Sequence, residues 1–305
     1  MIKTIKIWIA AARAPFFTAA VVPIALGAVT AWYNTGIFSI TLFLLTLTGG
    51  IFIHAGVNLI NDYFDHRSGA DESNRNPTPF SGGSRTIQKG ILTPAAVLRG
   101  AIACFAAGSL IGLYLNYLAP GNVILIIGLA GIFIAFFYTA GPIKMGYRGA
   151  GEAACAIGFG PVMVLGAYYV QAGSVSWLPV YASVPVAVLV ALILYINEFP
   201  DHDPDKEAGK NTLVVILGRK RAVKLFFVSI AFIYLWPPAG ILMGFLPISS
   251  LIVFFTLPIA LKAVKTAALK YDKIEELLPA NASTIGLHLV YGVLLILSFI
   301  LARVL

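Results

Sequence analysis

Two clusters of carboxylate and amide side chains have a spacing that could hold a divalent metal ion. The first runs from Asn58 to Asp71 and contains Asn61, Asp62 and Asp65. Several of these residues lie three, four or seven positions apart, which places side chains on neighbouring turns of one helix face. Clustered carboxylates repel one another unless a cation lies between them, and hard oxygen ligands suit Mg²⁺.

The second cluster has the same character and lies much later in the chain. Asn197 opens it, and Asp201 and Asp205 are four residues apart. Two such half-sites at facing helix ends could hold a pair of Mg²⁺ ions that bridge a diphosphate. The ions would act as Lewis acids while a leaving diphosphate develops negative charge, and nearby lysines and arginines would supply direct cationic partners. Solvated interfacial loops are the simpler alternative, but solubility does not require two matching clusters.

The rest of the chain is very apolar, which determines where these clusters lie. Of the 305 residues, 59% are hydrophobic and 11% are charged, and the mean hydropathy is +0.89. Because soluble domains carry roughly 25% charged residues, lipid must solvate most of this surface. Long uncharged runs give about nine membrane spans of roughly 20 residues. We place them at 14–32, 41–60, 95–118, 122–138, 153–171, 178–196, 223–243, 248–265 and 282–302.

This pattern predicts an all-α fold, a polytopic transmembrane helical bundle that forms a single integral-membrane domain over residues 1–305. The clusters follow the second and the sixth span, which suggests a duplicated four-helix unit. Spans one to four would cover about 14–138, spans five to eight about 153–265, and the ninth about 282–302. We interpret the N-terminal segment, which contains Lys6 and Arg13, as a short cytosolic interfacial helix rather than a signal peptide.

The charged residues are strongly one-sided. Twenty of the 21 Lys and Arg residues precede the first span or follow spans two, four, six and eight, and only Arg303 lies at the far end. The positive-inside rule therefore predicts a multi-pass protein of the cell membrane with a cytoplasmic N-terminus and cytoplasmic active-site loops. All 13 Asp and Glu residues lie in the same loops. Acids contribute little to orientation, so their position needs a chemical reason.

The motifs resemble those of the UbiA superfamily of intramembrane prenyltransferases over essentially the whole chain. NDYFDHRSGAD at 61–71 resembles a longer variant of the first family motif. NEFPDHDPDKEAGKNTLVVILG at 197–218 resembles the second motif of the 1,4-dihydroxy-2-naphthoate prenyltransferase (MenA) branch, although it has Glu198 where that branch often has Asn. FSGGSRTIQKGILTP after span two and FYTAGPIKMGYRGAGE after span four also resemble the branch.

The resemblance implies roles for individual residues. The metal ligands would be Asn61, Asp65 and Asp71 for one ion and Asn197, Asp201 and Asp205 for the other, with Asp62 as a further candidate. The diphosphate contacts would be Lys144, Arg85 and Lys89, joined by Arg13, Arg148 and Lys210. Tyr138 would lie near the allylic carbon and complete a catalytic set with Asp65, Asp201 and Lys144. Tyr147 and Arg148 would contact the acceptor.

The implied reaction is Mg²⁺-dependent transfer of a polyprenyl group from a prenyl diphosphate to an aromatic acceptor. By resemblance the acceptor is 1,4-dihydroxy-2-naphthoate, as in menaquinone-type quinone biosynthesis. Loss of diphosphate would leave an allylic cation that an electron-rich aromatic carbon attacks, while the apolar bundle accepts the tail. The same chemistry on 4-hydroxybenzoate or on geranylgeranylglyceryl phosphate stays open.

An organic-anion transporter is the rival from a different class of protein. Transporters commonly place charge at mid-bilayer on broken helices, whereas here the acids lie at one end and the opposite loops carry no charge. The lipid bilayer is an expected partner, but neither nucleic acid nor an obligatory protein partner is inferred. The roles of His54 and His288, which lie within apolar spans, stay open, and hydrogen bonding to a neighbouring helix is the more common role.

Overall fold

The structure is a computed structural model that describes residues 2–74 and 77–305, with side chains from residue 4 onward. Over these residues it is helical, and the only strand-like pairing is an isolated bridge between Arg148 and Asn211. The α-helices are α1 (Ile2–Ala11), α2 (Thr18–Thr35), α3 (Ile40–Ser68), α4 (Ala70–Ser73), α5 (Pro94–Leu118), α6 (Val123–Phe137), α7 (Gly151–Ile157), α8 (Met163–Ala172), α9 (Trp177–Glu207), α10 (Leu213–Leu217), α11 (Arg219–Leu242), α12 (Leu257–Lys270) and α13 (Ile274–Val304). Short 3₁₀ segments cover Ala14–Phe17, Met145–Tyr147 and Ile248–Thr256, and a π-helical turn covers Gly158–Val162.

Eight helical segments in the described part of the chain are long and apolar enough to cross a membrane. They are Ala14–Thr35, Ile40–Ser68, Pro94–Leu118, Gly151–Ala172, Trp177–Glu207, Arg219–Leu242, Ile248–Lys270 and Ile274–Val304. The apolar helix α6 has only 15 residues, which extend about 22 Å against a hydrocarbon core of about 30 Å. The predicted all-α, multi-pass membrane bundle is confirmed, and the approximate nine spans become eight plus this shorter helix.

Two of the predicted spans are not continuous α-helices. Segment 153–171 is divided into α7 and α8 by the π-helical turn, where Gly160 leaves helical geometry (φ −89°, ψ −105°) and Pro161 has no backbone N–H to donate. Segment 248–265 begins as a 3₁₀ segment and becomes α12 at Leu257. Pro258 lies in the first turn of α12, where its missing N–H breaks no helical hydrogen bond.

Both acidic motifs lie on helices that are longer than the sequence predicted. α3 continues past residue 60 to Ser68 and stops at Gly69, whose φ of 79° is a left-handed conformation that glycine adopts without strain. α9 continues past residue 196 to Glu207 and contains Pro200 and Pro204. The acidic side chains therefore project from helical backbone and not from loops.

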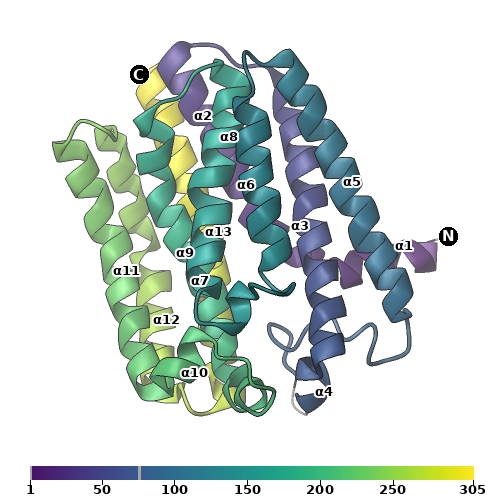
Figure 1. The fold of residues 1–305 in the computed structure, drawn as a ribbon. Coiled ribbons are helices and arrows are strands. Elements are labelled where there is room, and N and C mark those ends of the chain that lie inside the picture. The colour runs from purple at the N-terminus through teal and green to yellow at the C-terminus, as the bar shows by residue number, and fades with distance from the viewer. Residues whose placement is uncertain (1, 75–76) are drawn as a thin grey trace.

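Figure 1 shows the long helices side by side, with α4 and α10 at one end of the bundle and the C-terminus at the other. α3 packs against α5, and α9 contacts α7, α11 and α13. α1 runs across the bundle beside α5. Its Trp8 lies against Gly100 of α5, where an added Cβ would meet the indole ring at 2.5 Å.

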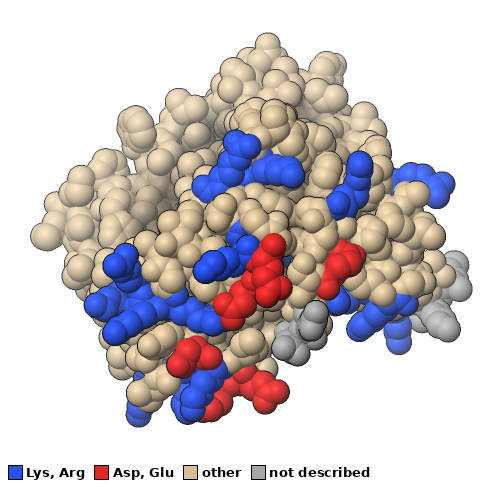
Figure 2. Space-filling model, turned by 60° about the horizontal axis from the view of Figure 1, so that its bottom comes forward, with Lys and Arg blue, Asp and Glu red and all other residues tan. Residues whose placement is uncertain are grey.

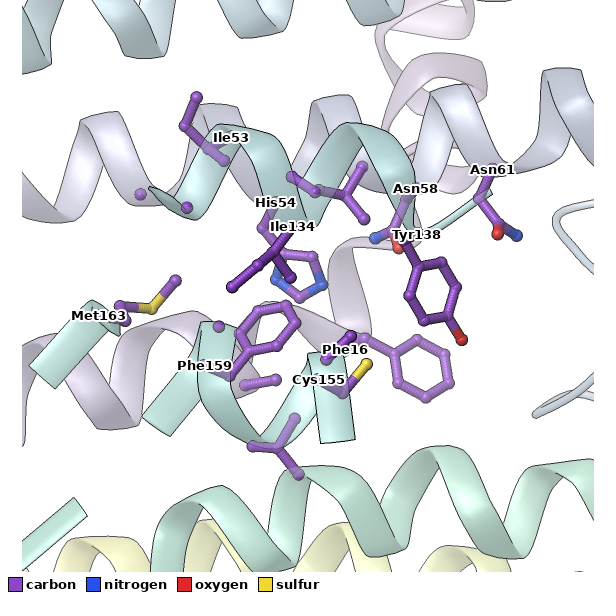
Figure 3. Close-up of a pocket in the computed structure, with 18 of the residues that line it drawn as sticks. Phe16, Ile53, His54, Asn58, Asn61, Ile134, Tyr138, Cys155, Phe159 and Met163 are labelled. Carbon is purple, nitrogen blue, oxygen red and sulfur yellow. The ribbon is translucent and has the colours of Figure 1, made fainter. Parts of the chain in front are cut away.

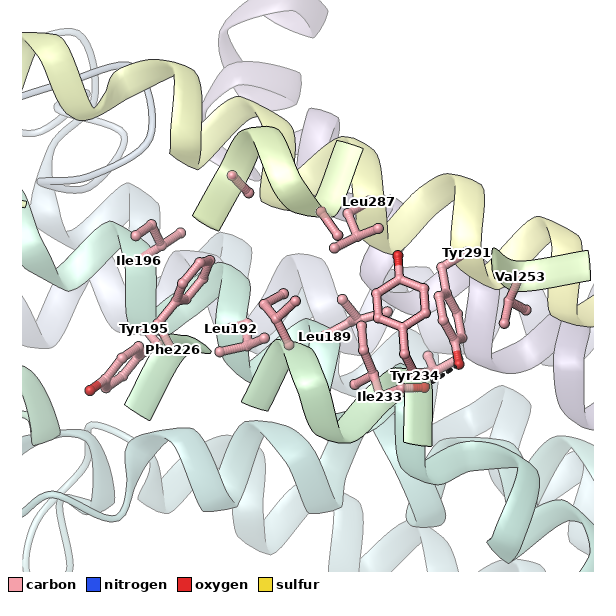
Figure 4. Packing of buried hydrophobic residues seen from close by; sticks show 14 of the residues in the cluster. Leu189, Leu192, Tyr195, Ile196, Phe226, Ile233, Tyr234, Val253, Leu287 and Tyr291 are labelled. Atoms are coloured by element: carbon pink, nitrogen blue, oxygen red, sulfur yellow. Dashed lines mark hydrogen bonds between the residues drawn. The ribbon is translucent and has the colours of Figure 1, made fainter. Parts of the chain in front are cut away.

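A hydrophobic cluster holds α9 in place against α11 and α13 (Figure 4). Tyr291 of α13 donates a hydrogen bond to the Ile233 carbonyl oxygen at 2.7 Å, and Tyr195 of α9 donates to the Ala222 carbonyl oxygen at 2.9 Å. Hydrogen bonds between membrane helices stabilise by roughly 0.6–2 kcal/mol each. This packing fixes the helix that carries the second acidic motif.

Figure 2 shows the end of the molecule on which both motifs lie, and Lys, Arg, Asp and Glu side chains gather there. Arg303 is at the opposite end, beside the C-terminus. Arg75, one of the cations that follow the second predicted span, lies outside the described residues. The charged side chains of the described chain therefore concentrate at the end where the acidic helices finish.

Candidate active site

Asp65 of the first motif faces a cavity near the end of α3. Its carboxylate accepts hydrogen bonds from Asn61 Nδ2 at 3.0 Å and from the Tyr147 hydroxyl at 2.6 Å. Asn58 lines the same cavity and donates to the Ala12 carbonyl oxygen at 2.8 Å. The helical spacing seen in the sequence thus brings Asn58, Asn61 and Asp65 to one face of α3.

Asp62 has a different set of partners. It forms an ion pair with Arg13, and it accepts hydrogen bonds from the Ser84 backbone N–H at 3.2 Å and from the Ser84 hydroxyl. Arg13 lies just before the first span, in a left-handed conformation (φ 53°), and Ser84 belongs to the loop between α4 and α5. Asp62 therefore ties two segments to α3, and its oxygens already have donors.

Asp201 of the second motif is held by the segment that follows the first motif. Its carboxylate accepts hydrogen bonds from Asn74 Nδ2 at 2.8 Å and from the Gly82 backbone N–H at 3.1 Å. One turn earlier, Asn197 accepts a hydrogen bond from Asn281 Nδ2 of α13 at 2.8 Å. The second motif is therefore held against the segment that follows the first.

The Lys210 ammonium joins the motifs. Its Nζ lies 3.8 Å from Asp65 Oδ2 and 3.6 Å from Asp205 Oδ1. Two backbone hydrogen bonds position this segment, from Lys210 N–H to the Asp205 carbonyl oxygen at 2.7 Å and from Asn211 N–H to the Tyr147 carbonyl oxygen at 3.0 Å. Burial lowers the pKa of Lys210, but the charges of Asp65 and Asp205 outweigh that and raise it well above its usual value. One cation is therefore shared by carboxylates from both motifs.

Asp71 adds another buried carboxyl group on the short helix α4. Gln88 Nε2 donates to it at 3.3 Å. Burial and the nearby charges of Asp65 and Asp62 raise the pKa of Asp71 well above its ordinary value. A cation placed among these carboxylates would allow Asp71 to ionise.

These polar groups form one end of a cavity of about 580 Å³. The polar residues that line it include Arg13, Asn61, Asp65, Asp71, Asn197, Asp201, Asp205 and Lys210. Figure 3 shows the apolar part, where Ile134, Phe159 and Met163 lie around His54, and Asn58, Asn61 and Tyr138 lie toward the polar end. The cavity therefore suits a ligand with a polar head and a long apolar tail.

Four of the cations predicted to contact a diphosphate do not line this cavity. Lys89 and Arg148 are exposed. Lys144 places its ammonium 5.3 Å from the centre of the Tyr147 ring, and the Arg85 guanidinium donates to a backbone carbonyl oxygen of α4. Arg13 and Lys210 do line the cavity, as does Tyr138, the residue predicted to lie near the allylic carbon.

Tyr147, a predicted acceptor contact, also lies outside the lining. Its hydroxyl is engaged by Asp65 and by the Ser68 hydroxyl at 2.7 Å. Sequence reasoning also missed buried polar residues around the site. Asn281 of α13 is fully buried. The feature of the sequence that could have identified it is an amide side chain inside an apolar span. Glu152, in the first turn of α7, is also buried.

The oxygen donors at the polar end suit a hard divalent cation. Asp205 Oδ2 is buried and has no hydrogen-bond partner among the described residues. Carboxylates and amide oxygens are the ligands that Mg²⁺ takes in proteins. Across the described chain, no three His, Cys, Asp or Glu side chains are already gathered tightly enough to hold a metal ion. The ammonium of Lys210 instead occupies the position between Asp65 and Asp205.

Comparison with known proteins adds independent information. The sequence model of the UbiA prenyltransferase family matches residues 20–285. The 2-carboxy-1,4-naphthoquinone phytyltransferase of Synechocystis sp. is 31% identical over 96% of this chain and 92% of its own length. The 1,4-dihydroxy-2-naphthoate octaprenyltransferase of Bacillus subtilis is 29% identical over 93% of this chain and 89% of its own length. A UbiA homologue from Archaeoglobus fulgidus, solved with DMAPP and Mg²⁺ bound, superimposes with a TM-score of 0.67 at 19% identity and covers 95% of this chain and 98% of that one.

Proposed function

Because the chain belongs to the UbiA prenyltransferase family, we propose that this membrane prenyltransferase acts on 1,4-dihydroxy-2-naphthoate. It takes a polyprenyl group from a prenyl diphosphate, depends on Mg²⁺, and serves menaquinone-type quinone biosynthesis. Two relatives that match almost the whole chain are named for naphthoate or naphthoquinone substrates. Their similarity supports the same acceptor class here.

The observation that carries this proposal is the position of Lys210. Its ammonium contacts Asp65 of the first motif and Asp205 of the second, at the polar end of an otherwise apolar cavity. Two acidic clusters that share one cation can also share a metal-bound anion. A prenyl diphosphate has the matching shape, because its anionic head is followed directly by an apolar chain.

Six side chains would hold Mg²⁺ in two groups, Asn61, Asp65 and Asp71 from the first motif and Asn197, Asp201 and Asp205 from the second. When bound, Mg²⁺ supplies the Lewis-acid charge that stabilises a leaving diphosphate. Asp62 is assigned a different role, because its ion pair with Arg13 positions that guanidinium at the cavity.

The chain's own residues then bind and orient the substrate. Arg13 and Lys210 contact the diphosphate oxygens, and the apolar cavity holds the tail and excludes water from the reacting carbon. The allylic C–O bond breaks with its electron pair leaving on the diphosphate, and a ring carbon of the acceptor supplies the electron pair of the new C–C bond. That carbon then loses the proton, or the carboxyl group as CO₂, that it carried, and the ring becomes aromatic again. Tyr138 presents its ring near the allylic carbon, where an aromatic face stabilises positive charge.

The experiment is prenyl transfer by purified protein in lipid, with labelled prenyl diphosphate and 1,4-dihydroxy-2-naphthoate. Asp65→Asn and Asp201→Asn should each lower transfer by about 100-fold or more, because metal ligation contributes several kcal/mol to the reaction. Asp203→Asn is the matched control, because Asp203 is exposed and pairs with Arg219 away from the cavity. EDTA should stop turnover and added Mg²⁺ should restore it. Near-normal transfer by either cavity variant would contradict the metal assignment.

A panel of acceptors tests the substrate separately from the chemistry. Naphthoate should be prenylated faster than 4-hydroxybenzoate or geranylgeranylglyceryl phosphate under the same conditions. A preference for either of the other two would keep the prenyltransferase activity but replace the acceptor.

A further inference from the structure

Five cations at the charged end of the bundle have no role in the active site. They are Lys220, Arg221 and Lys224 of α11 and Lys262 and Lys265 of α12. All five are exposed, and none forms an ion pair with a described residue. α11 and α12 pack against each other, and Lys and Arg side chains gather on the side of this end where the two helices lie (Figure 2). We refer to these five residues as the basic surface.

Three of these cations lie inside segments that are long and apolar enough to cross a membrane. Lys262 and Lys265 precede the end of the segment Ile248–Lys270 by eight and five residues, which is about 12 Å and about 7.5 Å of helix. Lys224 follows the start of Arg219–Leu242 by five residues, again about 7.5 Å. Cations that only set the topology can lie in the loops, so topology does not require lysines within these helices.

Apolar side chains flank these lysines on the outer face of each helix. Leu261 and Leu269 of α12 are 64% and 63% exposed, and Leu225 and Val228 of α11 are exposed as well. On α12, the lysines lie on the face opposite the buried alanines. A cation on such a face is surrounded by lipid tails unless its long side chain reaches the headgroup layer. The lysines of the basic surface are therefore placed to meet lipid headgroups.

The first turn of α11 adds positive charge where the helix dipole is already positive. Arg219, Lys220 and Arg221 open the helix, that turn contains no acid, and no side chain caps it. Cations are unfavourable at a helix N-terminus, whereas an anion stabilises it. Lys220 and Lys224 are four residues apart, a spacing at which like charges repel. An anion bound here would relieve both effects.

A groove beside Lys265 offers room for such an anion. Its volume is about 360 Å³, and it is lined by Lys265, Thr266, Leu269, Lys270 and Glu276. Glu276 is already paired with Lys270 and, at 3.2 Å, with Lys273. This pairing leaves the Lys265 ammonium and the Thr266 hydroxyl unengaged among the described residues, next to the exposed side chain of Leu269.

The combination of cations and lipid-exposed apolar side chains selects the ligand. A soluble anion would gain nothing from the exposed leucines, and an acidic protein segment would have to enter the lipid layer. An anionic phospholipid carries its phosphate at headgroup depth, and its acyl chains continue along the apolar faces of α11 and α12. Basic pockets between membrane helices bind such headgroups. We propose that the basic surface is a binding site for the headgroup of an anionic phospholipid.

A lipid bound at this site would also support the helix that carries the second acidic motif. Arg219, at the start of α11, donates to the Phe199 carbonyl oxygen at 3.2 Å and to the Asp203 carboxylate at 3.1 Å. Both acceptors belong to α9. Because a ligand that binds only the folded state stabilises it, the lipid should raise the unfolding temperature of the protein. The site is independent of the acceptor and of the metal ions.

The test measures the binding of single lipids to the purified protein in detergent by native mass spectrometry. The probes are phosphatidylglycerol and phosphatidylcholine with identical acyl chains. The first phosphatidylglycerol should bind the wild-type protein about 10-fold or more tightly than the first phosphatidylcholine, since each Lys or Arg near an anionic headgroup contributes a factor of about 5. Lys262→Gln/Lys265→Gln and Lys220→Gln/Lys224→Gln should each reduce this preference by about 5-fold or more.

Arg67→Gln/Arg99→Gln is the matched control, because it also removes two exposed cations at the charged end, but from α3 and α5. It should leave the lipid preference unchanged. A loss of preference in the control as large as in the other two variants would mean a diffuse effect of net charge, and would overturn the site.

Thermal unfolding gives a second readout. Phosphatidylglycerol should raise the unfolding temperature of the wild-type protein more than phosphatidylcholine does, and both double variants of the basic surface should lose this difference. Glycerol phosphate, which has the charge of the headgroup without acyl chains, should not displace the lipid. Equal affinity of the wild-type protein for the two lipids, or displacement by glycerol phosphate at the concentration of the lipid, would overturn the proposal. If a variant fails to fold, these two wild-type measurements still decide.

Discussion

Replacing Lys210 by Met tests whether a cation must lie between the two motifs. The substitution keeps an apolar stem but removes the ammonium that lies 3.8 Å from Asp65 Oδ2 and 3.6 Å from Asp205 Oδ1. At an effective dielectric constant of about 20, each contact is worth roughly 4 kcal/mol before desolvation. Removing one partner of a buried ion pair costs about 3–5 kcal/mol. Because the Lys210 side chain is 18% exposed, we expect the lower end of that range.

In EDTA, the Lys210→Met variant should unfold at a lower temperature than the wild-type protein, because about 3 kcal/mol corresponds to a shift of about 5 °C for a chain of this length. Mg²⁺ should recover more of the stability of the variant than of the wild type, since the metal no longer competes with an ammonium. A concentration about 100 times Kd stabilises by roughly 2.7 kcal/mol. The measurement is thermal unfolding in detergent, followed by tryptophan fluorescence over a Mg²⁺ titration.

Lys206→Met provides the control, because Lys206 is exposed one turn earlier at the end of α9. It should change neither the unfolding temperature nor the response to Mg²⁺. The reasoning would be refuted by a Lys210→Met protein that responds to Mg²⁺ no more strongly than the wild type. Prenyl transfer should be impaired in this variant even with saturating Mg²⁺, because Lys210 is also assigned to the diphosphate.

Three further predictions follow from other parts of the molecule. Gly27→Ala should lower the free energy of unfolding by about 1–3 kcal/mol, because an added Cβ would lie 2.3 Å from a backbone oxygen of α8. Gly128→Ala is the control and should be neutral in the same unfolding assay, because nothing lies within 4 Å of an added Cβ there. Mg²⁺ affinity measured by calorimetry should rise with pH. Burial and nearby carboxylates raise the pKa of Asp71, and Mg²⁺ binds the ionised form with release of a proton. An affinity independent of pH would contradict this. If the acidic motifs face the cytoplasm, an impermeant maleimide on intact cells should label Ser174→Cys but not Lys89→Cys, each in a background without native cysteines. The reverse labelling pattern would place the acidic motifs on the outer side of the membrane.

The parts of the fold that could be predicted from the sequence are those set by local pattern. Long apolar runs and one-sided charge predict the membrane helices and the shared side of the acidic motifs. Helical spacing predicts that Asn61 and Asp65 project together, and they are hydrogen-bonded at 3.0 Å. The helix ends were less predictable, because hydropathy falls at the first charged residue of each motif while the helical hydrogen bonds of α3 continue to Gly69.

Contacts between distant segments could not be predicted, because nothing in the periodicity of one segment identifies its neighbour. Arg13 and Asp62 are 49 residues apart and Tyr147 and Asp65 are 82 apart. Both pairs decide which carboxylates remain available for a metal ion. The same limit hid Glu152, since a single acid before an apolar helix resembles an ordinary membrane-interface charge.

The charge balance at the polar end of the cavity favours divalent ions over side chains as its main cations. The aspartates described in its lining are Asp65, Asp71, Asp201 and Asp205. Of the cations described there, Arg13 is committed to Asp62, and Lys210 is shared between two aspartates. A diphosphate adds negative charge to a site that is already short of positive charge, so its binding would be unfavourable without further cations. A divalent ion would bring the most charge in the least space, and the acidic groups on α3 and α9 are the side chains that would hold it.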